Sequence, residues 1–153
     1  MPETESTSDQ FILFELAGTT YGVRSRTVQQ MEMVEYITPV PNAPPFVEGV
    51  VFTRGQVVPA VNLRARFGFE KKPYDLQTRL IVVTDGARTV GLIVDSAREF
   101  VTIPGEAIQP PPEAIAGLSG KYLDGIATLG ERLVLILNVA EVLKLEQTVN
   151  TES

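Results

Sequence analysis

The side chains that most often carry enzyme chemistry are scarce in this chain. Its 153 residues include no histidine and no cysteine, so it lacks the usual acid–base group near neutral pH and any thiolate nucleophile. Ser119 lies in a Gly-Leu-Ser-Gly run without G-x-S-x-G spacing, and without histidine it cannot form a conventional triad. The pair Gly120-Lys121 lacks the rest of a P-loop. These patterns give no catalytic, metal or cofactor site.

The remaining polar candidates lie beside turns. Four acids fall at turns or strand ends, where solvated carboxylates are common, and form no recognisable catalytic pair: Glu48, Asp85, Asp95 and Asp124. Arg54 is the charged residue that stands out, because it sits at the tip of a hairpin whose arms are almost wholly apolar. An arginine on a rigid tip is a good interface anchor, although an ordinary exposed turn arginine is the alternative interpretation.

Composition limits the partners. The formal net charge is −6 and the pI is about 4.7, which disfavours binding to phosphate backbones. Hydrophobic content of 44% and charged content of 21% are typical of a soluble globular protein. The polar, acidic start does not resemble a signal peptide, and no apolar run is long enough to span a bilayer. We therefore expect a soluble protein without nucleic acid and without direct membrane contact.

The chain contains an internal sequence repeat, which indicates how its elements are arranged. Shifting 11–34 by 69 positions places it on 80–103, and shifting 46–67 by 76 places it on 122–143, with the apolar pattern kept. The shifts align Gly22 with Gly91 and Gly49 with Gly125. They also place Val28, Met31 and Val58 on Ala97, Phe100 and Val134. One structural unit therefore occurs twice. We interpret the chain as two similar lobes that form one protein.

Short apolar runs between turn signals predict an all-β fold. Strands are expected over residues 11–16, 20–23, 47–53, 56–61, 80–84, 89–94, 97–103, 122–129 and 133–137. Residues 27–35 favour a turn followed by a strand, with a short helix as the alternative. Asn62 and Asn138 are expected to cap short helices, 63–67 and 139–145. The folded domain is predicted to span 10–146, between disordered ends at 1–9 and 147–153.

The expected lobes are about 21–67 and about 80–145, with strand exchange between them left open. Each lobe has about 60 residues, a size that is marginal by itself. We therefore expect the two lobes to pack on one another.

The run Phe46 to Gly68 resembles the signature of the CheW family, the coupling proteins of bacterial chemotaxis. The family's pattern contains N-L-R-G, followed by a P and then V-D-L-R. The residues that match it are Gly49, Arg54, Gly55, Pro59, Leu63, Arg64, Arg66, Phe67 and Gly68. Further similarities are Tyr21-Gly22-Val23, the run from Val90 to Asp95, the run from Tyr122 to Ile126, and the run from Leu135 to Asn138. The resemblance covers about residues 10–146.

The resemblance implies two five-stranded SH3-like β-barrels around a shared core, related by the internal repeat and carrying short helices. It also implies a non-enzymatic adaptor that couples the cytoplasmic tip of chemoreceptors to the regulatory domain of a CheA-type histidine kinase. No cofactor is expected. The protein would be cytoplasmic, held at membrane-associated receptor arrays through its partners, with weak self-association in rings as a further expectation.

The same resemblance implies a receptor-binding surface near the groove between the lobes. Its expected members are Val28, Gln30, Arg54, Ala97 and Phe100. Core packing remains the alternative interpretation of Val28 and Phe100. The kinase-binding residues are not assigned by the sequence, beyond the expectation that the first lobe's exposed barrel end and hairpin edges take part.

Three departures from the family's pattern bear on this surface. Phe52-Thr53 replaces the N-L before the turn arginine, Asn62 replaces an aspartate, and Gln30 replaces a glutamate associated with receptor coupling. Gln30 cannot form a charged pair with Arg54, although its amide can form hydrogen bonds.

Two alternative functions stand beside the adaptor. One is a CheW-like binding module of another two-component or motility pathway with a different partner. The other is a carboxylate hydrolase, which no arrangement of residues supports.

Overall fold

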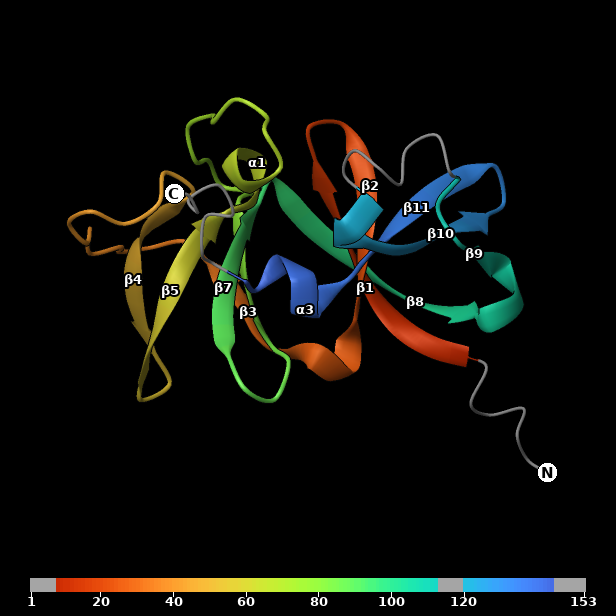
Figure 1. The fold of residues 1–153 in the computed structure, drawn as a ribbon, viewed down its shortest axis with the longest axis horizontal. Helices are drawn as coiled ribbons and strands as arrows, with labels where there is room; N and C mark the ends of the chain where they lie inside the picture. The colour runs from red at the N-terminus through yellow and green to blue at the C-terminus, as the bar shows by residue number, and fades with distance from the viewer. Residues whose placement is uncertain (1–7, 113–119, 145–153) are drawn as a thin grey trace, which may run out of the picture.

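The computed structural model describes residues 8–112 and 120–144, which form two β-sheets (Figure 1). The six-stranded sheet has the order β8 (Ser96–Pro104), β1 (Ser8–Leu16), β2 (Thr19–Arg24), β11 (Arg132–Leu137), β10 (Leu123–Leu129) and β9 (Ile108–Gln109). The five-stranded sheet has the order β3 (Val28–Met33), β6 (Arg79–Thr84), β7 (Thr89–Val94), β5 (Gln56–Asn62) and β4 (Val47–Thr53). We call them the six-stranded and five-stranded lobes. The all-β prediction is confirmed.

The described helical segments are short. The 3-10 turns are η2 (Ser25–Thr27), η3 (Gly105–Ala107) and η4 (Gly120–Tyr122), and the α-helices are α1 (Leu63–Arg66) and α3 (Val139–Val142). Among the described helices, none combines the length and the apolar character that crossing a membrane requires. In Figure 1, α1 and α3 lie between the two lobes, near the middle of the molecule.

Each lobe combines segments of both repeats. The β1–β2 hairpin joins β10–β11 through the parallel pair of β2 with β11, and the β6–β7 hairpin joins β4–β5 through the parallel pair of β7 with β5. The lobes therefore differ from the consecutive segments 21–67 and 80–145. Their strands are exchanged, as the sequence left open. The chain passes from the five-stranded to the six-stranded lobe between β7 and β8.

Most local predictions agree with the structure. Residues 25–33 form η2 followed by β3, so the turn-and-strand interpretation is confirmed over these residues. The Asn62 and Asn138 side chains accept hydrogen bonds from the amides of Ala65 and Glu141, both at 3.1 Å, which confirms the two helix caps. Helix α3 ends at Val142, three residues before the predicted end, and the predicted tail 147–153 lies outside the described residues.

The N-terminal boundary needs a correction. Ser8 and Asp9 were expected to be disordered, but both belong to β1 and pair with β8. The Asp9 carboxylate accepts hydrogen bonds from Arg24 and Arg26, each at 3.1 Å. Two arginines that are distant from Asp9 in sequence therefore bind the start of the strand. The polar composition of residues 1–9 predicted disorder and gave no sign of this contact.

The largest hydrophobic cluster lies between the lobes. Alternate residues of β1 point to opposite sides. Ile12 and Phe14 pack into the cluster between the lobes, together with Ile81 and Leu92 of the other sheet. Phe11 belongs instead to a cluster inside the six-stranded lobe. A third cluster lies inside the five-stranded lobe. The central strands are thus buried on both faces, which explains their nearly continuous apolar runs. The cluster between the lobes also joins two units that would be only marginally stable alone.

The repeated glycines Gly49 and Gly125 allow a preceding segment to approach a strand. A Cβ atom on Gly49 would lie 2.1 Å from the Thr38 carbonyl oxygen, and one on Gly125 would lie 2.7 Å from that of Gln109. Each glycine also follows an irregularity in strand register. The sequence repeat at these positions therefore reflects the same close backbone contact in both lobes.

Asp95, between β7 and β8, joins elements of both lobes. The Arg64 guanidinium of α1 donates to both Asp95 oxygens, each at 2.9 Å, and the Ala17 amide of the β1–β2 turn donates at 2.9 Å. Burial alone would raise the pKa of Asp95, but the bonds from Arg64 and Ala17 outweigh it and lower the pKa below its usual value. The ionised form of Asp95 is therefore stabilised by folding.

Asn62 explains one departure from the family's pattern. Its oxygen caps α1, while its amide nitrogen donates to the Glu48 carboxylate at 2.9 Å. Lys71 also approaches Glu48, at 3.3 Å. Burial, supported by the nearby Glu48 charge, raises the pKa of Tyr74 to about 12. An aspartate at position 62 could cap the helix but could not donate to Glu48, so Asn62 and Glu48 form a matched pair.

We predict that Asp95→Asn lowers the free energy of unfolding by about 1–3 kcal/mol at pH 7, because Arg64 loses a charged acceptor. The folded-state pKa of Asp95 is depressed, so this stabilisation is present above its usual pKa. It disappears as the pH falls below about 4 and through the folded-state value. Urea unfolding of wild type and variant at several pH values tests this. Asp124→Asn, at an exposed ion pair, is the control, and equal losses in both variants would contradict the prediction.

We also predict that Asn62→Asp lowers the free energy of unfolding by about 1–2 kcal/mol, because two carboxylates then face each other. The double variant Asn62→Asp/Glu48→Gln should recover most of this loss, since a glutamine can donate to the new aspartate. The control is Asn138→Asp, because among the described residues Asn138 caps α3 without donating to an acid. Failure of the double variant to recover stability would show that the Glu48 pair is not the cause.

Candidate functional site

Three of the predicted receptor-binding residues lie on the faces of the sheets that form the inter-lobe core. Val28 and Ala97 are half-buried and pack against this core. Phe100 is opposite Ile12 in the β8–β1 pair, and opposite residues of an antiparallel pair share a face. Phe100 is nevertheless 66% exposed, so it extends the apolar inter-lobe face to the surface. The alternative interpretation, packing in the core, therefore applies to Val28 but not to Phe100.

Two methionines on β3 also extend the apolar inter-lobe face to the surface, and neither is among the predicted receptor-binding residues. Met31 is opposite Ile81 of the inter-lobe core, and Met33 is opposite Arg79. Their exposed fractions are 37% and 45%. The repeat already aligned Met31 with Phe100, so the signal for Met31 was present in the sequence.

A groove opens beside these residues at the junction of the lobes. It has a volume of about 240 Å³ and is lined by Gln77, Arg79, Ser96 and Ala97. We call it the inter-lobe groove. Met33 shares a sheet face with Arg79, and Phe100 follows Ala97 on β8. The groove therefore has apolar side chains beside it on both lobes.

Gln30 lies on the other face of β3. An irregularity in register between Val28 and Gln30 places Gln30 opposite Val82, which belongs to the core inside the five-stranded lobe. The Gln30 amide donates to the Glu32 carboxylate at 2.9 Å and also to the Thr53 hydroxyl, which in turn donates to Glu32 at 2.8 Å. These three side chains, the polar cluster, connect β3 and β4, the two edge strands of the sheet.

The polar cluster relates two departures from the family's pattern to each other. Gln30 brings an amide donor, and Thr53 and Glu32 supply its acceptors. A glutamate at position 30 would instead place a second carboxylate beside Glu32, without the donor that Glu32 now uses. Gln30 and Thr53 are therefore mutually consistent, and the Gln30 amide is directed to Thr53 rather than to the neighbouring Arg54.

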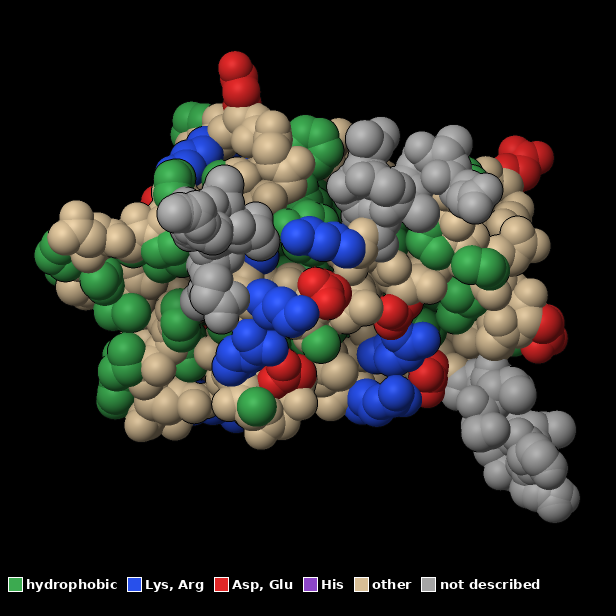
Figure 2. All heavy atoms as spheres, viewed as in Figure 1, with side chains coloured by type: hydrophobic (Ala, Val, Ile, Leu, Met, Phe, Trp, Pro, Cys, Tyr) green, Lys and Arg blue, Asp and Glu red, His purple; other side chains and the backbone are tan. Residues whose placement is uncertain are grey.

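Arg54 lies at the tip of the β4–β5 hairpin. Its φ of 52° and the Gly55 φ of 81° are the two positive values that a tight hairpin turn requires. Next to the turn, Phe52 and Val57 are directly opposite each other and are 74% and 61% exposed. We call the exposed pair Phe52 and Val57 the hairpin surface, with Arg54 at the turn between the two strands. In Figure 2, hydrophobic side chains gather at this end of the molecule, over β4 and β5, while charged side chains of both signs mix across the middle.

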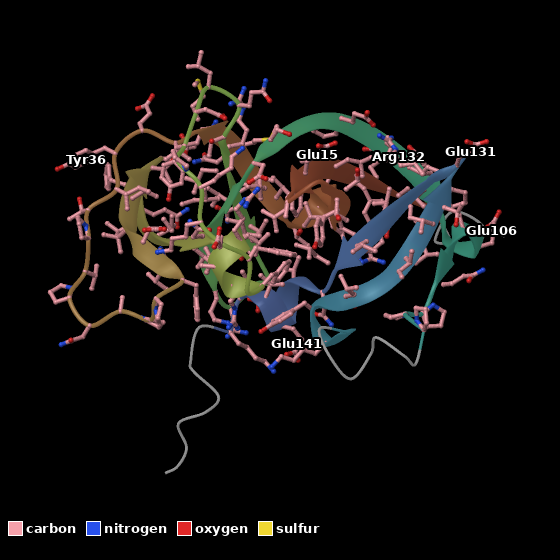
Figure 3. All side chains as sticks on the ribbon, turned by 90° about the horizontal axis from the view of Figure 1, so that it is seen from above. Glu15, Tyr36, Glu106, Glu131, Arg132 and Glu141 are labelled. Carbon is pink, nitrogen blue, oxygen red and sulfur yellow. The ribbon has the colours of Figure 1, made fainter. Side chains whose placement is uncertain are left out.

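The six-stranded lobe has a different polar contact at the corresponding place. The repeat aligns Gln30 with Glu99 and Gln56 with Arg132, and Arg132 forms an ion pair with Glu99 at 3.0 Å. Figure 3 shows Arg132 beside Glu131 at the end of the β10–β11 hairpin. Both lobes thus use side chains to connect a hairpin end to an edge strand, one with an ion pair and the other with an amide, a hydroxyl and a carboxylate.

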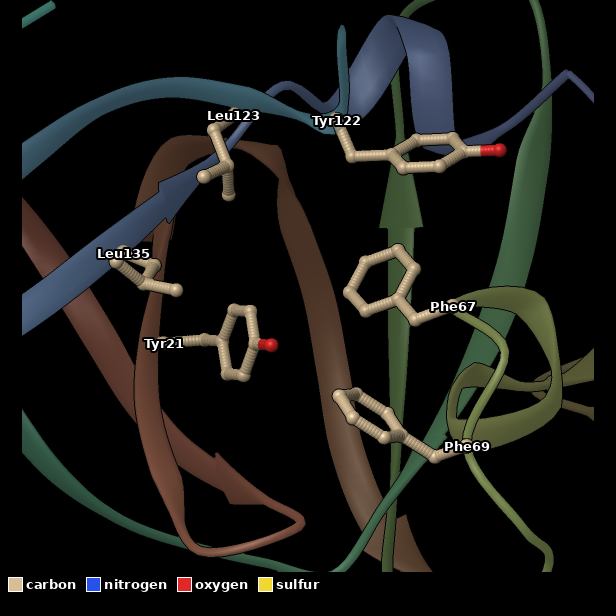
Figure 4. A pocket seen from close by; sticks show the side chains of 6 residues that line it. All are labelled: Tyr21, Phe67, Phe69, Tyr122, Leu123 and Leu135. Atoms are coloured by element: carbon tan, nitrogen blue, oxygen red, sulfur yellow. The ribbon is translucent and has the colours of Figure 1, made fainter. Parts of the chain in front are cut away.

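A small aromatic cavity lies where the lobes meet on the side of α1 and α3 (Figure 4). It measures about 70 Å³ and is lined by Tyr21, Phe67, Phe69, Tyr122, Leu123 and Leu135. Phe67 packs between Tyr21 and Tyr122, with ring centroids 5.8 and 5.1 Å apart. This volume is well below the several hundred Å³ of typical ligand pockets, so we regard the cavity as part of the contact between the lobes.

The acids considered for catalysis have structural partners. Asp95 binds Arg64, Asp124 binds Arg24, and Asp85 binds its neighbour Arg88. Glu48 binds Asn62 and Lys71. Within residues 8–112 and 120–144, no group of three or more acids is placed to hold a metal ion. Ser119 lies outside the described residues. The inter-lobe groove and the hairpin surface are the candidate functional surfaces.

Comparison with known proteins agrees with this architecture. The CheW-like domain family matches residues 10–147. The chain is 33% identical to a chemotaxis protein CheW of Klebsiella aerogenes over 94% of this chain and 86% of that protein. It is 32% identical to the Helicobacter pylori CheW, over 88% of this chain and 81% of that protein.

A solved structure supports the same relationship. The scaffolding protein TtCheW from Thermoanaerobacter tengcongensis superposes with a TM-score of 0.79 and 30% identity, covering 84% of this chain and 88% of that one. The predicted pair of SH3-like barrels is consistent with this match, except that β9 adds a short sixth strand to one sheet. The chain therefore belongs to the CheW family of chemotaxis proteins.

Proposed function

We propose that this protein is a non-enzymatic adaptor that couples chemoreceptors to a CheA-type histidine kinase in bacterial chemotaxis. It would act in the cytoplasm, at membrane-associated receptor arrays that it reaches through its partners. Family membership supports the chemotaxis role, and the absence of a catalytic arrangement among the described residues is compatible with a protein that only binds. Such an adaptor supplies a coupling free energy between the states of its two partners.

The observation that carries the receptor-binding part is the exposure of Phe100 and Met31 on the faces of the inter-lobe core. Large apolar side chains next to a groove are typical of protein–protein contacts. We propose that the receptor lies along the inter-lobe groove, against Val28, Met31, Ala97 and Phe100. Arg54 would add a charged contact from the hairpin tip, with Gln30 setting the position of the neighbouring Thr53.

The kinase would bind a different face. Phe52 and Val57 form an exposed apolar pair on the β4–β5 hairpin. Both hairpin arms belong to the five-stranded lobe, with β4 at the sheet edge. We propose that this pair contacts the kinase's regulatory domain. Two separate apolar surfaces on one rigid body allow both partners to bind at once, which an adaptor requires.

A CheW-like binding module of another two-component or motility pathway is the second candidate. The departures at Gln30, Thr53 and Asn62 favour it, because they change polar groups near the surface where the family's receptors would bind. It differs from the first candidate in its partners and not in its fold. A pull-down from the source cell's lysate, followed by identification of the captured proteins, separates the two.

We predict that single substitutions separate the two binding activities. Phe100→Ser should weaken binding to a receptor signalling fragment by about tenfold or more without affecting kinase binding, because aromatic side chains that a partner buries dominate interface energies. Arg54→Ala should also weaken receptor binding. Phe52→Ser should have the opposite pattern, weakening only kinase binding. Titration calorimetry with the purified receptor fragment and the kinase regulatory domain measures both affinities.

Arg88→Ala, at the β6–β7 turn, is the control for the loss of an exposed arginine. Loss of both activities in Phe100→Ser would contradict the assignment of separate surfaces. Binding of wild-type protein to neither partner would refute the adaptor function and favour another pathway.

A further inference from the structure

Arg79 lies in the inter-lobe groove, at the start of β6. In the ladder it is opposite Met33 on one side and Val94 on the other. Val94 belongs to the inter-lobe core, so Arg79 is on the face that this core occupies. Arg79 also lines the groove together with Gln77, Ser96 and Ala97. A cation therefore lies at a position where the neighbouring strand residues on the same face, Ile81 and Val83, are apolar and buried.

Two backbone carbonyls hold the Arg79 guanidinium. Its Nη1 donates to the carbonyl oxygens of Leu76 and Thr78, at 2.8 and 3.0 Å. A guanidinium has five N–H donors, so these two bonds orient the group and leave donors for a ligand. One of the bonds is to the backbone of Leu76, whose side chain is 81% exposed and precedes Gln77 of the groove.

The charge of Arg79 has no acidic partner in the part of the chain that is described. Within residues 8–112 and 120–144, no carboxylate forms an ion pair with it. Five other described arginines form ion pairs: Arg24, Arg26, Arg64, Arg88 and Arg132. Among the described residues, Arg54 at the exposed turn and Arg66 over the Phe46 and Tyr122 rings also lack one, but neither lines the inter-lobe groove. The chain as a whole carries a net charge of −6. An uncompensated cation in a groove of such an acidic protein points to a ligand that supplies the missing carboxylate.

Exposed apolar residues lie on the elements that line the groove. Met33 is directly opposite Arg79, Phe100 is three residues beyond Ala97, and the backbone carbonyl of Leu76 accepts a hydrogen bond from Arg79. When a partner covers such side chains, it excludes water from an ion pair formed beside them, and the lower dielectric strengthens that pair. A carboxylate flanked by apolar residues would match this arrangement better than a wholly polar or wholly apolar segment.

We propose that Arg79 determines partner specificity in the inter-lobe groove by binding a carboxylate in an amphipathic segment of the receptor, with the partner's apolar side chains against Met33, Leu76 and Phe100. This inference rests on the proposed function and adds the chemistry of the segment that the groove accepts. A guanidinium can bind a carboxylate with two parallel hydrogen bonds, which fixes the register of the segment as well as its charge.

The test is calorimetric titration of the receptor signalling fragment into wild type, Arg79→Gln, Arg79→Lys and Arg88→Gln, at low and at high salt. Arg88→Gln is the charge-matched control, because Arg88 lies at the opposite end of the same hairpin and is paired with Asp85. We expect Arg79→Gln to weaken binding about tenfold, or about 1.4 kcal/mol, and to reduce its salt dependence. We expect Arg79→Lys to recover part of the affinity and Arg88→Gln to resemble wild type.

Circular dichroism and the thermal midpoint of each variant identify any loss of folding, and Arg79→Lys tests the charge if Arg79→Gln does not fold. Wild-type affinity in Arg79→Gln would overturn the inference while leaving the adaptor function intact. Equal losses in Arg79→Gln and Arg88→Gln would overturn it as well, because the effect would then be general electrostatics. Reduced self-association with unchanged receptor affinity would show that a second copy supplies the carboxylate. Failure of wild type to bind the fragment would instead refute the proposed function.

Discussion

Burial of a shared apolar core between two small lobes is the constraint on which the rest of this structure depends. Each lobe has its own smaller cluster, but the largest one requires side chains from both sheets. The Asp95 contacts with Arg64 and Ala17 lie where the chain passes between the lobes, and they hold elements of both together. Any surface at the margin of this core, the inter-lobe groove included, therefore has walls whose relative position is fixed by the packing itself.

Each departure from the family's pattern at Gln30, Thr53 and Asn62 has a hydrogen-bonding partner within the chain. Gln30 and Thr53 share one set of hydrogen bonds with Glu32, and Asn62 is matched to Glu48. In both cases a neutral amide donates to a nearby carboxylate. Each substitution taken alone suggests a weakened site, but each pair forms a satisfied local network. The polar groups at these departures are therefore satisfied by neighbouring side chains of this chain.

Local features could be predicted well from the sequence, because they depend on residues close together in the chain. The β4–β5 hairpin follows from apolar runs on either side of Arg54-Gly55, and the Asn62 and Asn138 caps follow from the chemistry of helix ends. Strand exchange could not be predicted, since strands buried on both faces show no alternation that would identify their neighbours. The direction of Gln30 depends on a single register shift in β3, which the sequence does not mark. The repeat indicated Met31, because it aligns Met31 with Phe100. The solvent exposure of Met31 depends on where the inter-lobe core ends, which the sequence does not show.

The exchange of strands has a consequence for how the protein is made. The β1–β2 hairpin is among the first segments to leave the ribosome, but its parallel neighbour is β11, where Gly22 pairs with Ile136. The six-stranded lobe cannot close until nearly the whole chain has been synthesised, whereas every strand of the five-stranded lobe precedes Asp95. Long-range pairings of this kind slow folding and leave sheet edges exposed in the meantime. The order of synthesis thus favours completion of the five-stranded lobe first. The N-terminal hairpin can pack on that lobe before β10 and β11 are available to pair with it.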